Sequence, residues 1–157
     1  MEVSFMNLSF KAESVEKDMK SNIAKIVGLS AAFNNVDCYN DIIMPGAFAE
    51  TMKENSKWPV LRHHDWKIKI GFCGEAEEVK QGLKTTSFVS LDTQDGKEQV
   101  ALSLLALEHG AKDAQSIGYI AKEWEIEEDK KRGRVRKLKT IQMWEHSFVT
   151  WGANDKA

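Results

Sequence analysis

The residues best suited to covalent chemistry surround Ser116, in the stretch Ala114-Gln115-Ser116-Ile117-Gly118-Tyr119. Gly118 lets another backbone come close and permits dihedral angles that a side chain would forbid. A serine in this setting can present its hydroxyl beside backbone N–H groups, such as those of Ile117 and Gly118, which is what acyl transfer requires of a nucleophile and an oxyanion site. The pattern is equally typical of a strand serine followed by a bulge glycine. The rest of the chain must therefore supply a base and an orienting group.

Histidines are the candidate bases, and the sequence has four: His63, His64, His109 and His146. His63 and His64 are consecutive, so on an extended strand they would point to opposite faces and only one could face a site. Asp65 follows and could fix the tautomer of His64, although a His-His-Asp run is also typical of a solvated loop. His109 lies at the expected C-terminus of a helix, where the helix dipole favours a cation, and we interpret it as structural.

The last predicted strand contains Glu145 and His146 among apolar neighbours. A carboxylate in such surroundings is at least partly buried and needs a partner, for which a histidine is suitable. A surface glutamate beside a packed histidine fits the same pattern. Because side chains alternate along a strand, only one of the two can face a given site.

No motif for cofactor or metal binding occurs. The sequence has no Walker loop, no dinucleotide-binding glycine fingerprint and no His-Glu-x-x-His zinc motif. Cys38 and Cys73 lack metal-ligand spacing, and we expect reduced thiols. The basic run 130–132 is offset by three preceding acidic residues, and the net charge of -2 gives no general attraction to nucleic acid or anionic membranes. We therefore expect no cofactor, no metal, no nucleic-acid partner and no membrane partner.

The length of 157 residues, with 42% hydrophobic and 29% charged residues, predicts a single domain over 1–157 with a buried core. Apolar alternation predicts about seven strands, around residues 3–13, 23–29, 58–61, 67–72, 84–91, 122–128 and 134–150. Residues 14–22 are interpreted as a polar connector and 75–81 as an acidic excursion. Helices are expected at 46–54 and 96–109, the second capped by Asp95, with Glu98 at the capping-box position and Gly110 after its end. This strand-dominated α+β order favours an antiparallel barrel or sandwich over a doubly wound sheet.

Several landmarks of the chain occur in an order that resembles the prohead proteases of tailed double-stranded-DNA phages, which are capsid-maturation serine peptidases related to herpesvirus assemblin. The matching motifs run from about residue 24 to the C-terminus, and they are Ala32-Phe33 leading to Asp37, Asp41-Ile42-Ile43-Met44-Pro45-Gly46-Ala47-Phe48, His64-Asp65, Ile70-Gly71, Gly82-Leu83, Ser116-Ile117-Gly118-Tyr119, and Glu145-His146-Ser147-Phe148-Val149 with Ala153-Asn154 behind. The specific part is the Pro-Gly-Ala-Phe block combined with His-Asp and Ser-Ile-Gly-Tyr. The chain departs from the family at Gly152, where proline is usual, and in its short tail.

The resemblance implies a herpesvirus-protease-like antiparallel barrel with a few surrounding helices. It implies Ser116 as nucleophile, His64 as general base and Glu145 as the third catalytic member. His146 is the alternative third member, because the herpesvirus relatives use a second histidine. Glu145 is favoured, since it matches the acidic position of the family's last motif.

The resemblance also implies the biological role. The expected activity is that of a serine endopeptidase that cleaves the scaffold segment of the major capsid protein, and itself, during prohead maturation. It would act in the host cytoplasm, inside the assembling prohead, and by analogy as a homodimer. The departure at Gly152 keeps open a catalytically inactive module that binds capsid or scaffold without cutting. A third interpretation is an unrelated small β-barrel binding domain in which the motifs are coincidental.

Overall fold

The computed structural model of the chain describes residues 4–10 and 12–150, and of residues 4–10 it describes the backbone alone. The residues Gly152 and Ala153-Asn154, at which the sequence was compared with the family motif, lie outside the described residues. The elements, in chain order, are β1 (Ser4–Phe10), β2 (Ser14–Asp18), β3 (Ile23–Ala32), β4 (Asp41–Ile43), α1 (Ala49–Glu54), β5 (Pro59–Arg62), β6 (Asp65–Val79), β7 (Gly82–Ser90), α2 (Gln94–His109), β8 (Asp113–Asp129) and β9 (Gly133–Phe148).

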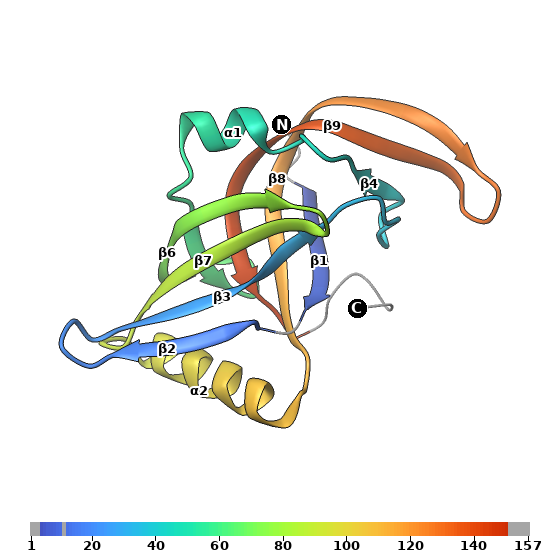
Figure 1. Ribbon diagram of the computed structural model, residues 1–157. Coiled ribbons are helices and arrows are strands. Elements are labelled where there is room, and N and C mark those ends of the chain that lie inside the picture. Colours follow the sequence, from blue (N-terminus) through green and yellow to red (C-terminus); the bar gives the residue numbers. More distant parts are fainter. Residues whose placement is uncertain (1–3, 11, 151–157) are drawn as a thin grey trace.

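The strands form one mixed sheet in the order β1-β8-β9-β5-β6-β7-β3-β2, with β4 also pairing with β9 (Figure 1). β4 and β5 run parallel to β9, whereas the other ladders are antiparallel. In the described part of the chain no ladder joins the ends of this order, β1 and β2, so the sheet is not closed. The strand-dominated α+β class is confirmed, and the prediction of an antiparallel barrel is wrong.

The parallel pairs arise from a crossover that strand periodicity does not reveal. β4 pairs with β9 at residues 136–138, and β5 pairs with it again at 146–148. Successive parallel strands need a connection of a dozen or more residues. Residues 44–58, which include α1, provide that connection and bring the chain back to the same edge of β9 further along. The turn that follows β5 is thereby placed beside the end of β9.

Two polar stretches that the sequence analysis left outside the sheet are strands. β2 lies within the expected connector, and the acidic residues 75–79 continue β6. β2 is an edge strand, where exposed charges protect against pairing with other chains. Its polar sequence therefore does not show the apolar alternation by which strands are predicted. The helix predicted at 96–109 is confirmed as α2, and Gly110 ends it with a left-handed φ of 62°. The short helix predicted at 46–54 begins later, at Ala49.

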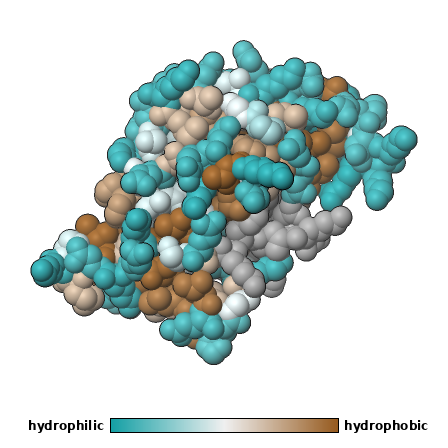
Figure 2. Space-filling view, viewed as in Figure 1, coloured by the Kyte–Doolittle hydropathy of each residue, from teal (hydrophilic) through white to brown (hydrophobic). Residues whose placement is uncertain are grey.

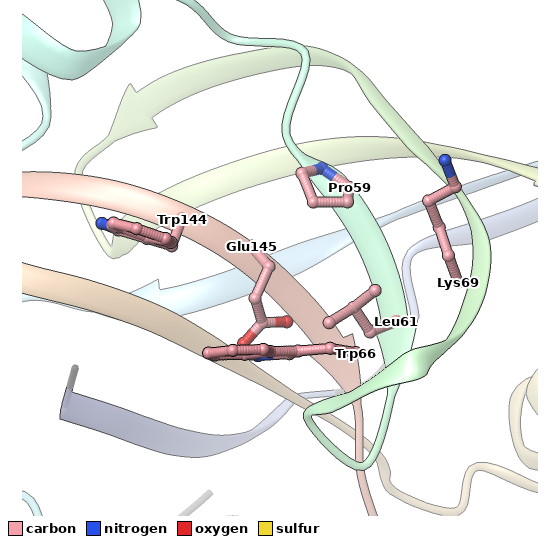
Figure 3. A pocket seen from close by; sticks show the side chains of 6 residues that line it. All are labelled: Pro59, Leu61, Trp66, Lys69, Trp144 and Glu145. Atoms are coloured by element: carbon pink, nitrogen blue, oxygen red, sulfur yellow. The ribbon is translucent and has the colours of Figure 1, made fainter.

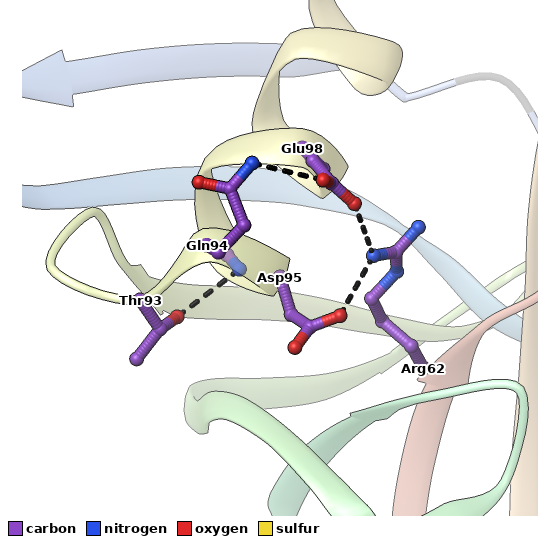
Figure 4. A network of polar contacts seen from close by, with 6 residues as sticks. Arg62, Thr93, Gln94, Asp95 and Glu98 are labelled. Carbon is purple, nitrogen blue, oxygen red and sulfur yellow. Dashed lines mark hydrogen bonds and ion pairs between the residues drawn. The ribbon is translucent and has the colours of Figure 1, made fainter.

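The residue that caps the N-terminus of α2 differs from the predicted one, and the acidic residues of the first helical turn bind β5 instead. Thr93, rather than Asp95, caps the helix, because its Oγ1 accepts a hydrogen bond from Gly96 N at 3.1 Å. Asp95 and Glu98 instead accept hydrogen bonds from Arg62 Nη1 at 3.0 and 3.1 Å (Figure 4). Arg62 is the last residue of β5, so these ion pairs hold the strand end that leads into His63 and His64.

Two groups of buried hydrophobic residues make up the core. One packs near α1 and includes Phe48, Ile117 and Tyr119, and the other packs near α2 and includes Val100 and Phe148. Residues 113–120 of β8 and 145–148 of β9 are buried throughout. Side chains on these segments are therefore held by packing on every side. Neither helix in the described residues has the length and apolar character that crossing a membrane would require.

Candidate active site

His64 lies on a two-residue hairpin turn. His63 and His64 connect β5 to β6, and both have positive φ, 54° and 58°, as a type I′ turn requires. Left-handed backbone costs a non-glycine residue roughly 1–2 kcal/mol, so surrounding contacts must hold the turn. His63 N donates to Phe148 O at 2.9 Å, and His64 N donates to Ser147 Oγ at 3.2 Å. The turn, and not strand alternation, separates the two side chains: His63 is exposed, whereas His64 is partly buried.

Ser116 lies near the start of β8, where this strand pairs with both β1 and β9, and is fully buried. Its Oγ is 2.6 Å from His64 Nε2. The two residues are remote in the sequence, and the pairing of β9 with both β5 and β8 is what brings them together. Ser116 is thus a strand residue, and its hydroxyl also lies beside a histidine that can act as a base.

Glu145 completes a chain of hydrogen bonds. Its Oε1 is 2.6 Å from His64 Nδ1, and the side chain is almost fully buried. These contacts fit an imidazole whose Nδ1–H donates to Glu145 and whose Nε2 accepts from Ser116 Oγ–H. Gly118 pairs with Glu145 across the ladder, and a Cβ at Gly118 would lie only 2.4 Å from Oε1. The glycine of the Ser-x-Gly pattern is therefore the residue that leaves room for the carboxylate.

Ser147 is a positioning residue that the sequence analysis did not single out. Its Oγ donates to Glu145 Oε2 at 2.5 Å and accepts from His64 N at 3.2 Å. One buried hydroxyl thus connects the carboxylate to the backbone of the histidine turn. The available signal was spacing, because a residue two positions after Glu145 lies on the same face of a strand.

The side chain of His146 faces away from those of Ser116, His64 and Glu145. It is fully buried, and its Nε2 lies 3.0 Å from Ser87 Oγ. Its Nδ1 has no hydrogen-bond partner among the described residues. Burial, helped by the nearby His64, lowers the pKa of His146 to about 4, so the ring is neutral at pH 7. The structure brings Glu145, and not His146, to His64.

The remaining candidates are not part of this arrangement. Asp65 is exposed, and its Oδ1 accepts from Lys67 N at 2.8 Å. His109 is exposed at the end of α2. Cys38 and Cys73 form no disulfide, and burial raises the pKa of the Cys73 thiol to about 11. No group of three or more His, Cys, Asp or Glu side chains in the described chain is arranged to hold a metal ion.

The serine, histidine and carboxylate have the arrangement of a hydrolytic triad, in which a base lies between a nucleophile and an acidic group that orients it. A comparison with protein-family models matches residues 9–157 to the caudovirus prohead serine proteases. The chain belongs to this family.

Two similar proteins extend the comparison. The prohead protease of Enterobacteria phage HK97 is 30% identical over 135 residues, which cover 83% of this chain and 56% of that protein. The chain thus spans a little over half the length of this relative. The capsid assembly protease of bacteriophage T4, gp21, has a similar structure, with a TM-score of 0.60 and 9% identity over 97% of this chain and all of that one. This second likeness supports the capsid-protease fold.

Asp37, in the loop before β4, and Asp41, the first residue of β4, have a structural part in this member of the family. Asp41 is buried and accepts from Arg136 Nε and Nη2 at 2.8 and 2.6 Å and from Tyr119 Oη at 3.0 Å. Asp37 Oδ1 accepts from the backbone N–H groups of Tyr39 and Asp41. Burial raises the pKa of Asp37 to about 6, although the N–H groups of Asp41 and Tyr39 that donate to it act in the opposite direction. These contacts attach the loop before β4 to β8 and β9, and they do not reach Ser116.

The position of Ile117 and Gly118 in the sheet gives their backbone amides no special arrangement as donors to an oxyanion. Ile117 and Gly118, whose amides were considered for this role, lie in β8 where it pairs with β1 on one side and β9 on the other. Amides in such a position normally serve the ladder hydrogen bonds.

Proposed function

We propose that the chain is a serine endopeptidase of prohead maturation, in which Ser116 is the nucleophile, His64 the general base and Glu145 the group that orients His64. The observation that carries the proposal is the pair of 2.6 Å contacts that His64 makes with Ser116 Oγ and Glu145 Oε1. Both lie within the hydrogen-bond reach expected of a working nucleophile and base. Membership of the prohead protease family gives the geometry its biological setting.

The contacts support the following reaction. Ser116 Oγ attacks the scissile carbonyl carbon while its proton passes to His64 Nε2. Glu145 stabilises the resulting imidazolium through Nδ1–H. His64 then gives the proton to the departing amine, which leaves an acyl ester on Ser116. A water molecule, deprotonated by His64, attacks this ester; His64 then returns the proton to Ser116 Oγ as the acyl bond breaks, and the peptide acid is released.

The substrate of the proposal is the scaffold segment of the major capsid protein, together with the protease itself, inside the assembling prohead in the host cell. The T4 protein of similar fold is named a capsid assembly protease. An extended peptide beside a strand edge is a common way for β-rich proteins to bind such segments.

The burial of Ser116 favours a second candidate function. Because the residue is fully buried, a peptide reaches its hydroxyl only if neighbouring groups move. A catalytically inactive module that binds capsid or scaffold would have no need of such movement. Covalent labelling of Ser116 by an active-site serine reagent separates the two candidates, because an inactive module would not react.

Co-expression with the cognate capsid protein tests the proposal directly. Wild-type chain should convert the capsid protein to a shorter form, and Ser116→Ala should leave it at full length. Ser56→Ala is the matched control, because Ser56 lies in the loop between α1 and β5. Cleavage that persists in Ser116→Ala, with a fold unchanged by circular dichroism, would show the assignment to be wrong.

Self-association is also part of the proposal, and α2 is the surface that supports it. The helix buries Gln99 and Ser103, which hydrogen-bond to each other at 3.1 Å, while Leu102 and Leu105 are more than half exposed. Hydrophobic residues gather at the lower end of the molecule in Figure 2, where α2 lies in Figure 1. Paired α2 helices in a homodimer would cover these leucines. Sedimentation of wild type against Leu102→Lys tests this, and a monomeric wild type would rule it out.

A further inference from the structure

A pocket of about 330 Å³ lies directly beside Glu145. We call it the indole pocket, and it is lined by Pro59, Leu61, Trp66, Lys69, Trp144 and Glu145 (Figure 3). Its volume is at the lower end of the range of sites that bind small ligands. Pro59 and Leu61 come from β5, Trp66 follows the His63–His64 turn, and Trp144 precedes Glu145 on β9. The elements that position the triad therefore also build the pocket.

The two tryptophans of the indole pocket are unusually exposed for their size. Trp66 is 68% exposed and Trp144 is 46% exposed. Large aromatic side chains that remain in water next to a hollow mark binding sites, since covering them gains much apolar contact at little cost in side-chain entropy. The exposure also means that neither indole is needed to fill the core.

A β-bulge places Trp144 at this position. Gly118 pairs with Glu145 and the next residue, Tyr119, pairs with Met143, so Trp144 has no partner across the ladder. Such a bulge redirects side chains locally, and bulges are common beside active sites. Strict alternation would put neighbouring residues on opposite faces, whereas here Trp144 and Glu145 line the same pocket.

The charges around the indole pocket favour an uncharged occupant. Both carboxylate oxygens of Glu145 are already hydrogen-bonded, one to His64 and the other to Ser147. An acidic group in the pocket would be repelled by Glu145, and a basic one would compete with His64 for it. In Figure 3 the Trp66 ring, seen from its edge, is drawn directly below the Glu145 carboxylate, and the Lys69 ammonium points away from it. The remaining walls, Pro59 and Leu61, are apolar.

The distance from the nucleophile limits which substrate residue can enter. The carboxylate of Glu145, a residue that lines the pocket, is separated from Ser116 Oγ by His64, that is, by one imidazole ring and two hydrogen bonds of 2.6 Å. This span is comparable with the roughly 7 Å that two residues of an extended chain cover. A peptide attacked by Ser116 would therefore bring a side chain within about two residues of the cleaved bond to the pocket.

We propose that the indole pocket is the subsite that selects the cleavage sequence, by taking a large apolar side chain of the peptide, such as that of leucine, isoleucine, methionine or phenylalanine. The inference rests on the proposed endopeptidase function and adds a sequence preference to it. Trp66 and Trp144 are the specificity-determining residues. The occupying side chain also displaces water from the pocket that Glu145 lines while the peptide is bound.

Cleavage profiling tests the subsite. Wild-type protein digests a mixture of peptides prepared from a bacterial proteome, and mass spectrometry identifies the new termini. We expect large apolar residues to be enriched at one position within about two residues of the cut. In a peptide made from the best-cleaved sequence, replacing that residue by alanine should lower kcat/KM at least about ten-fold for the wild type. In Trp66→Ala and Trp144→Ala the original peptide and its alanine variant should have nearly the same kcat/KM.

A matched variant and a labelling control make the outcomes distinct. Trp124→Ala removes an indole of similar exposure, 49%, from the distal part of the β8–β9 hairpin and should keep the wild-type ratio. The subsite alone is overturned if a fluorophosphonate labels Ser116 in the wild type but Trp66→Ala and Trp144→Ala keep the preference for the large apolar residue. A wild type that is neither labelled nor active on any peptide overturns the endopeptidase, and the subsite with it.

Discussion

Replacing Ser147 by alanine removes the one hydroxyl that connects the carboxylate of the site to the histidine turn. Two hydrogen bonds disappear, one to Glu145 Oε2 at 2.5 Å and one from His64 N at 3.2 Å. Ser147 is fully buried, so water does not readily replace it. A hydrogen bond to a charged group contributes about 1.5–3 kcal/mol, and each 1.4 kcal/mol of transition-state stabilisation changes the rate about ten-fold. We expect kcat to fall about 10- to 150-fold.

The assay must distinguish a positioning effect from a general loss of stability. A peptide with the mapped cleavage site gives kcat and KM separately, and KM should change little, because Ser147 is buried behind Glu145. Ser87→Ala is the control, since it removes a comparable buried hydroxyl from the neutral His146. In urea unfolding Ser87→Ala should lose about 1 kcal/mol and Ser147→Ala about 1.5–3 kcal/mol, but Ser87→Ala alone should keep its kcat. Equal kcat in the two variants would refute the reasoning.

Three further predictions concern nearby residues. The pKa of His146 is about 4 in the fold and near 6.5 when unfolded, so the unfolded chain binds an extra proton as pH falls between these values. The contribution of His146 to stability should therefore fall by about 2 kcal/mol from pH 7 to 5, so in urea unfolding His146→Gln should lose about that much less stability than the wild type over this range. Gly118→Ala should keep the fold but lower kcat at least about ten-fold, because its methyl group would lie 2.4 Å from Glu145 Oε1; wild-type kcat would contradict this. His63→Val should unfold about 1–2 kcal/mol more easily than His63→Asn, because asparagine tolerates positive φ; equal stability would argue against strain in the turn.

Local chemistry made much of the fold predictable. The α2 helix was predicted from its apolar spacing and from Gly110, and the hairpin at 129–133 from its turn residues, where Asp129 Oδ1 accepts from the N–H groups of Lys131 and Arg132. The sheet order was not predictable in this way. Whether β5 pairs with β9 in a parallel sense depends on the crossover through α1, and periodicity within one strand carries no information about its neighbours.

The candidate site shows the same division. The residue types and the family resemblance pointed to Ser116, His64 and Glu145, and the structure brings these three side chains together. Ser147 was missed because a strand serine has no distinguishing pattern of its own. For the two histidines at 63 and 64 the sequence left an extended strand and a solvated loop open. It did not reveal the tight turn, because their positive φ values depend on the hairpin register and not on residue type. The bulge at Trp144 was equally hidden, because it exists only relative to β8.

The central claim is that folding activates the Ser116 hydroxyl through His64. Treatment with a fluorophosphonate, followed by peptide mass spectrometry, measures this most directly. We predict a single adduct on Ser116 in the wild type, and labelling slower by several powers of ten in His64→Ala, as expected when a triad loses its base. An adduct elsewhere, or equally fast labelling of Ser116 without His64, would contradict the account.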